Sequence, residues 1–488
     1  MGNKTGLVAE HSLLEKLLLI SWYVTVASAL FGDCLLRVKL PIGGHFFLFR
    51  GAILFTCLIY LLVLLRRREN PFRGLSGIEL CFVAAAVCMT AYGVVSAAWS
   101  LSLGAWFSRV FTMCQMFAFV FLFLKLCRNE RVLRVTLLLI GAATAVCILG
   151  GLAECFRGPF FDTPYFWPTY MFFEKPMYAP IFTFYNTNGF AVSLLFTLEL
   201  LYLHMAFHWE KNGPGLSRRL LAGISAGITL MLFLCCAGGG RLAILSLPVI
   251  LSGLALWLAM RYKKGLAVFI AFILCLAFVY VGENYEEIRY GVTQRWEQIA
   301  GPASTPGVPD QPSTPEPPKK NPFGTLQDVV PSVTGSGKGE GLQESDNVRL
   351  ALLKNSWKML VESKGLGIGA GNAELRMADF DNTGGKVNIH CFIMEVLLEF
   401  GVSALLPLLV LFIMIFRTLI LRLYEAVKAR RREPLSDILF LLFTIAAFPL
   451  LSTANSSSWG LAAMWLYVAL VLLYSGRMER YSGEERAE

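Results

Sequence analysis

The sequence has little charge for its length. Of its 488 residues, 16% are Asp, Glu, Lys or Arg, whereas 56% are hydrophobic. Soluble globular domains carry about 25% charged residues, so this composition excludes a soluble domain. It predicts an all-α polytopic membrane protein that is surrounded by membrane lipid.

Metal-binding and disulfide motifs are also missing. The twelve cysteines form no C-x-x-C pair and show no spacing typical of a zinc site or a disulfide framework. They are scattered mostly through apolar segments, which is typical of small buried residues. We therefore expect no metal ion and no cofactor.

Apolar runs of about 20 residues, the length that crosses a bilayer, predict about twelve transmembrane helices. A cleaved signal peptide is the less favoured interpretation of the first run, because that run is long and acidic residues precede it. The runs are 13–32, 46–65, 77–98, 105–125, 133–154, 189–208, 219–237, 241–260, 265–282, 391–416, 436–452 and 458–475.

The placement of Lys and Arg predicts the orientation of these helices. Basic residues concentrate in the connections after every second run, as in the three arginines at 66–68 and the three at 430–432. Both termini are therefore expected in the cytoplasm. The net charge of +9 follows from this topology and does not indicate a nucleic-acid partner.

This topology divides the chain into three parts. Residues 1–282 hold the first nine helices, with an interfacial outer loop at 157–189 that is rich in Pro and aromatic residues. Residues 283–390 form one large extracytoplasmic loop, whose Pro/Gly-rich linker at about 301–342 is expected to be disordered. Residues 391–488 hold the last three helices and a cytoplasmic tail.

Charged residues at the outer ends of the helices point to a polar cavity on that face. Any single one could instead snorkel to the interface, but four share the same leaflet. They are Arg50, Arg109, Glu154 and Arg241.

One histidine stands at the outer mouth of the tenth run. A lone histidine is more often structural than catalytic, but His390 has Asn388 before it and Glu395 and Glu399 after it. The sequence therefore favours His390 as a functional residue.

Two asparagines, Asn186 and Asn188, precede the sixth run. They could bind sugar hydroxyls or cap the helix that follows. For Asn188 alone, the helix cap is the favoured interpretation.

The outer loop ends in a predicted helix and a glycine-rich turn. Ser345 can cap a helix that runs to about Ser363, and Arg349 would lie near its first turn, where a cation opposes the helix dipole. This misfit indicates either an external anion or a solvated arginine. The glycines of "GLGIGAGN" at 365–372 could form an anion-binding nest, although a tight turn is favoured. The apolar face of the helix would comprise Leu350, Leu353, Trp357 and Leu360.

An enzyme on the outer face has no nucleotide sugar, so its donor must arrive already activated in the membrane. A glycan linked to polyprenyl diphosphate fits, with a glycan or glycolipid as acceptor. Arginine suits a diphosphate because the guanidinium makes two-pronged contacts. His390 is the candidate general base for the acceptor hydroxyl. The candidate arginines are Arg50, Arg109, Arg241 and Arg349.

Four short motifs occur in order between about Tyr185 and Leu408. They are "YNTNGFA" at 185–191, "GGGRLAILSL" at 238–247, "DNVRLALLKNSWKMLVESKGLGIGAGN" at 346–372 and "NIHCFIMEVLLEFG" at 388–401. In these motifs the chain resembles the O-antigen ligase and O-antigen polymerase family, which includes teichuronic acid polymerases. The chain differs from the family pattern at Gly239 and Gly240, where a Ser or Thr is frequent, and at Cys391, where an Asn is frequent.

The resemblance implies a GT-C-like fold and a metal-independent, inverting glycosyltransferase in the bacterial cytoplasmic membrane. It would use undecaprenyl diphosphate as carrier, as a polysaccharide polymerase or as an O-antigen-type ligase. His390, Arg349 and Arg241 would be catalytic. Two other classes stay open: a lipid-linked oligosaccharide flippase or other transporter, and a sensor or scaffold that binds glycan. The expected substrate-binding residues are Arg50, Arg109, Asn186, Asn188, Asn388, Glu395 and Glu399.

Overall fold

The computed structural model describes twelve ranges of the chain, and within them the protein is almost entirely helical. Two antiparallel pairs of two-residue strands are the exception: β1 (Val38–Lys39) pairs with β2 (His45–Phe46), and β3 (Pro168–Thr169) with β4 (Met177–Tyr178). The ranges are 13–32, 38–39, 45–160, 168–169, 177–178, 180–184, 187–208, most of 226–237, 241–262, 340–430, 432–454 and 458–485.

The helices agree closely with the apolar runs of the sequence. In chain order they are α1 (Leu13–Ala29), α2 (Leu48–Arg67), α3 (Gly77–Val95), η1 (Ser96–Trp99), α4 (Leu103–Leu126), α5 (Glu130–Arg157), α6 (Thr187–His208), α8 (Arg241–Tyr262), α12 (Glu340–Glu362), α13 (Ala373–Met377), η2 (Asp381–Thr383), α14 (Phe392–Lys428), α15 (Arg432–Ala454) and α16 (Ala462–Glu485).

The protein is an integral membrane protein. Six helices in the described ranges are long and apolar enough to cross a membrane. Ten of the twelve predicted runs overlap a described helix. The run at 219–237 is described only in part, the run at 265–282 and most of the linker at 301–342 lie outside the described residues, and the number twelve stays a prediction.

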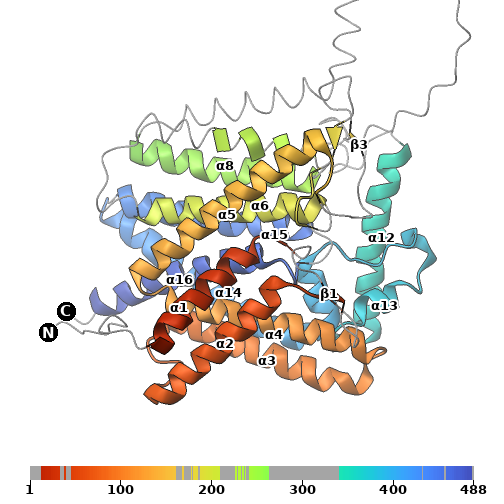
Figure 1. Cartoon of the computed structure of the whole chain (residues 1–488), viewed down its shortest axis with the longest axis horizontal. Coiled ribbons are helices and arrows are strands. Elements are labelled where there is room, and N and C mark those ends of the chain that lie inside the picture. The colour runs from red at the N-terminus through yellow and green to blue at the C-terminus, as the bar shows by residue number, and fades with distance from the viewer. Residues whose placement is uncertain are drawn as a thin grey trace, which may run out of the picture.

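The long helices lie side by side, and α12 stands across one end of them (Figure 1). Helix α16 occupies the centre, because it contacts α3, α4, α6 and α14 and nearly all its side chains from Ala462 to Ser475 are buried. This stretch is apolar on every side, and such a helix is stable only when neighbours surround it.

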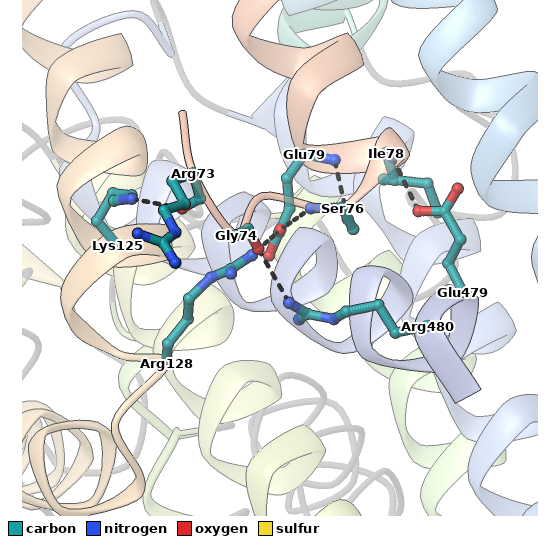
Figure 2. Close-up of polar contacts among 9 residues, drawn as sticks. All are labelled: Arg73, Gly74, Ser76, Ile78, Glu79, Lys125, Arg128, Glu479 and Arg480. Carbon is teal, nitrogen blue, oxygen red and sulfur yellow. Dashed lines mark hydrogen bonds and ion pairs between the residues drawn. The ribbon is translucent and has the colours of Figure 1, made fainter. Parts of the chain in front are cut away.

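At the end of the bundle opposite α12, three segments meet at the first turn of α3 (Figure 2). Ser76 and Glu79 form a capping box: the Ser76 hydroxyl accepts from the Glu79 N–H at 3.2 Å, and the Glu79 carboxylate accepts from the Ser76 N–H at 2.6 Å. The same carboxylate pairs with Arg128, from the turn between α4 and α5. Glu479 of α16 accepts from the Ile78 N–H at 3.0 Å. The start of α3 therefore holds two other segments together.

We expect Glu79→Gln to destabilise the protein. Glu79 is fully buried, so the change leaves the Arg128 charge without its partner, and losing one member of a buried pair costs about 3 kcal/mol. Thermal unfolding in detergent measures the loss. Glu69→Gln is the control, because Glu69 forms an exposed ion pair with Arg67, and such a pair contributes at most about 1 kcal/mol. Equal effects of the two changes would contradict the prediction.

Candidate functional site

Helix α14 is broken near its start. Gly401 has φ of 75° and ψ of −178°, which separates a short segment, 392–400, from the long helix that begins at Val402. The loop before α14 supplies the missing backbone bonds: the N–H groups of Ile368 and Gly369 donate to the carbonyls of Leu398 and Glu399 at 2.8 and 3.0 Å. The Val402 N–H donates to the Gly365 carbonyl at 2.8 Å. A helix break inside a membrane protein is tolerated only where such partners exist.

The glycines of 365–371 are required because the loop lies against other backbone. Gly365, Gly367, Gly369 and Gly371 all have positive φ. A Cβ on Gly367 would lie 2.5 Å from the Gly401 nitrogen, and one on Gly371 would lie 2.6 Å from the Ala105 carbonyl. Glycine alone combines this backbone conformation with this approach.

The anion-nest interpretation of this loop is wrong. Each N–H from Gly365 to Asn372 donates to an acceptor inside the protein. Among them, Ala370 donates to the Ser96 hydroxyl at 3.1 Å and Gly371 to the Glu399 carboxylate at 3.2 Å. No backbone donor of the loop is left to bind an anion.

The loop is also bound to the end of α3. The Tyr92 hydroxyl donates to the Leu366 carbonyl, and the Asn372 side chain accepts from the Leu101 N–H at 3.0 Å. The loop therefore fills the space between the break in α14 and the connection from α3 to α4.

Arg109 of α4 makes the densest electrostatic contact of this region. Its Nη2 lies 2.9 Å from Glu395 Oε1 and its Nε lies 3.0 Å from Glu399 Oε2. Its side chain is 11% exposed, that of Glu395 7% and that of Glu399 0%. Glu374 of α13 lies further out, at 3.9 Å from Nη2. This buried cation between carboxylates holds α4 against the short segment of α14, because separating them would leave a buried charge without its partner, which is destabilising.

His390 stands two residues before α14, with φ of 55°. Only a few per cent of non-glycine residues adopt this left-handed conformation, and it is often found at functional sites. Cys391 follows in an extended conformation as the N-cap. Ile389 is buried in a small apolar cluster that fixes the turn. The cluster comprises Leu352, Met359, Leu360, Ile368, Ala373, Met377, Ile389 and Leu398.

Helix α12 differs from its prediction at the N-terminus. It begins at Glu340, five residues before the predicted cap Ser345, so half-buried Arg349 lies beyond the first turn. The dipole argument for an anion at Arg349 is therefore wrong, because the dipole acts within the first turn.

The buried face of α12 also differs. Leu352, Asn355 and Met359 face the cluster, whereas Leu350 and Trp357 are exposed. The predicted face is wrong at these two positions. Asn355 is accommodated because its side-chain amide donates to Asn382 at 2.8 Å.

The other predicted residues are spread over several elements. Arg50 of α2 donates to the Thr112 hydroxyl of α4 at 2.9 Å, one turn from Arg109. Asn388 is half-buried beside His390, and Asn188 lies in the first turn of α6. Arg241 is the first residue of α8, but its side chain lies outside the described residues, as does Asn186.

Glu154 makes backbone hydrogen bonds that the sequence did not predict. Its carboxylate accepts from the N–H groups of Phe160 at 3.0 Å and Ile181 at 2.9 Å, and so closes the loop after α5. Glu154 thus caps this loop.

Tyr92 and Ser96 contact the glycine-rich loop but carry no signal in the sequence, because they look like ordinary residues of an apolar helix.

Asp379 and Asp381 do carry a signal, since they form a D-x-D pair that the sequence shows. Both are exposed after α13. The described part of the chain contains no group of three His, Cys, Asp or Glu residues that could hold a metal ion.

Residues 226–423 match the sequence profile of the O-antigen ligase family. Over this part of its length the chain is similar to that family. It is also 24% identical, over 489 aligned residues, to the teichuronic acid biosynthesis protein TuaE of Bacillus subtilis (strain 168), across 94% of this chain and 84% of that protein. The O-antigen ligase match includes Arg241, Arg349 and His390, whereas Arg50 and Arg109 precede it.

We expect Gly367→Ala to destabilise the protein at the break in α14. The residue has a φ of +86°, and a Cβ would lie 2.5 Å from the Gly401 nitrogen, so the free energy of unfolding should fall by about 3 kcal/mol or more. Gly384→Ala is the matched control: Gly384 has φ of 57° but open space around its Cβ position, so only about 1 kcal/mol is expected. Thermal unfolding compares them, and similar losses would contradict the role of close packing.

Proposed function

We propose that this chain is a membrane glycosyltransferase that moves a glycan from polyprenyl (undecaprenyl) diphosphate to a sugar hydroxyl at the outer face of the bacterial cytoplasmic membrane. The observation that carries the proposal is His390, held in a left-handed turn at the mouth of the broken helix α14 and inside the region that matches O-antigen ligases. The likeness to a teichuronic acid biosynthesis protein supports a surface polysaccharide as product.

In the proposed reaction His390 accepts the proton of the acceptor hydroxyl. The hydroxyl oxygen forms a bond to the anomeric carbon of the donor while the bond from that carbon to the diphosphate oxygen breaks. The polyprenyl diphosphate leaves with the electron pair, and Arg241 and Arg349 stabilise its charge. A single displacement inverts the anomeric centre and needs no metal in this scheme.

Polymerase and ligase share this chemistry and differ in the acceptor. A polymerase adds the glycan to another lipid-linked glycan, whereas a ligase adds it to a different glycolipid. Gels of surface polysaccharide from cells lacking the gene separate the two. Accumulated single repeats indicate a polymerase, and unattached lipid-linked polymer indicates a ligase.

A lipid-linked oligosaccharide transporter is the second candidate, because Glu199 lies fully buried in the middle of α6. Neither of its carboxylate oxygens has a hydrogen-bond partner in the described part of the chain. Ionisable groups within the membrane and interrupted helices are both typical of transporters. Purified protein in detergent discriminates, since product formation without any compartment excludes pure transport.

We expect His390→Ala to lower turnover of a lipid-linked donor by about 10²–10⁴-fold, the range of general acid–base catalysis, with donor binding retained. His390→Gln keeps hydrogen bonding but cannot take up the proton, so it should be equally slow. His204→Gln is the control, because His204 of α6 contacts the Tyr474 hydroxyl at 2.8 Å, a bond that glutamine can keep. A near-normal rate for His390→Gln would remove the base assignment.

Arg349→Lys and Arg241→Lys should each reduce turnover. The ammonium is a point charge and cannot reproduce the two-pronged contact of a guanidinium with diphosphate oxygens. Arg376→Lys on α13 is the control, since this exposed arginine has no role in the proposal. Turnover assays with purified protein measure the effect, and full activity of both variants would exclude the diphosphate role.

A further inference from the structure

We infer that Arg109 is a positioning residue: its ion pairs with Glu395 and Glu399 hold the short segment 392–400 of α14 against α4, and thereby set the place of His390. The inference rests on the proposed function for the role of His390. It departs from the sequence-based expectation that Arg109, Glu395 and Glu399 bind the substrate.

The short segment is held from three sides, and Arg109 holds the side that faces α4 through its two ion pairs. The N–H groups of Ile368 and Gly369 in the glycine-rich loop donate to its last carbonyls. On another side, the rings of Phe392 and Phe400 lie 5.2 and 5.6 Å from that of Trp459, which precedes α16. The segment cannot shift along α4 without breaking the ion pairs. Since His390 lies two residues before the segment, a shift would move the histidine too.

The local charge argues against a diphosphate at Arg109. One guanidinium faces the carboxylates of Glu395 and Glu399 at about 3 Å and that of Glu374 at 3.9 Å. Three carboxylates around one cation would repel a diphosphate, and a buried position strengthens that repulsion. The pairing with segment 392–400 is therefore the role that the geometry supports.

Arg109 lies outside the part of the chain that matches O-antigen ligases. That match covers 226–423, whereas Arg109, Tyr92 and Ser96 come from the preceding helices. The first helices therefore contribute to the region around His390 as well as to the membrane bundle.

The test compares two equal substitutions, Glu399→Gln and Glu79→Gln, in the purified full-length protein. Both remove a fully buried carboxylate that pairs with an arginine, but Glu79 lies at the opposite end of α3 from the glycine-rich loop. With a lipid-diphosphate-linked glycan as donor, Glu399→Gln should lower kcat by about 10–100-fold, the cost of a misplacement near 1 Å. Its KM should change little. Glu79→Gln should lower thermal stability and keep kcat.

Arg109→Lys is the conservative variant. Lysine keeps the charge but cannot reach both glutamates at once, so kcat should fall less than with Arg109→Gln. A higher KM with unchanged kcat would assign Arg109 to donor binding and overturn the inference. A loss of activity in Glu399→Gln that its unfolded fraction fully explains would overturn it as well.

A second measurement separates this inference from the proposed function. Cys391 directly follows His390 and is half-buried, so its rate of labelling by N-ethylmaleimide reports on the local structure. Mass spectrometry of its peptide should show about tenfold faster labelling in Glu399→Gln than in the wild-type protein, as local opening becomes easier, whereas Glu79→Gln should leave the rate unchanged. If labelling rises but the wild-type protein turns over no lipid-linked donor, the proposed function is wrong and the positioning role of Arg109 is supported. If labelling is unchanged, the positioning role of Arg109 is wrong.

Discussion

A guanidinium buried between two carboxylates joins the early helices of this protein to its broken helix. Arg109 comes from α4, and Glu395 and Glu399 come from α14, almost three hundred residues later in the chain. Each of the three charges is tolerable in the interior because the others are present. The contact therefore makes the placement of the segment that follows His390 depend on the N-terminal half of the chain.

The break in α14 depends on a second constraint, the need of every backbone group at membrane depth for a partner. At Gly401 the helix cannot satisfy its own carbonyls, and the loop at 365–371 satisfies them with its N–H groups. That arrangement leaves no room for side chains in the loop, which explains its alternating glycines. Rigid backbone pairing and a buried ion pair thus fix the same short segment by independent means.

Much of the fold could be predicted from the sequence, because a membrane span needs only length and apolar composition. The pairing of Arg109 could not, since the sequence gives charges on one face of a membrane but no distances between them. The face of α12 was assigned wrongly because Trp357 looks like a core residue, whereas the structure buries Asn355, whose amide finds a partner in Asn382. The start of α12 was missed because a capping residue such as Ser345 can also stand inside a helix. For His390, the neighbouring polar residues gave the signal, but its left-handed turn follows from packing that involves α12 and α13.

Helix α3 touches both ends of the molecule. Its first turn contacts Glu479 of the last helix, and Arg480 donates to the Gly74 carbonyl just before α3. At the other end, Tyr92 of its last turn and Ser96, which follows the helix, contact the glycine-rich loop. The C-terminal end of the chain is thus one rigid helix away from the neighbourhood of His390. A fusion partner joined close after Arg480 would press on that helix, so a tagged protein needs a spacer before its behaviour can stand for that of the native chain.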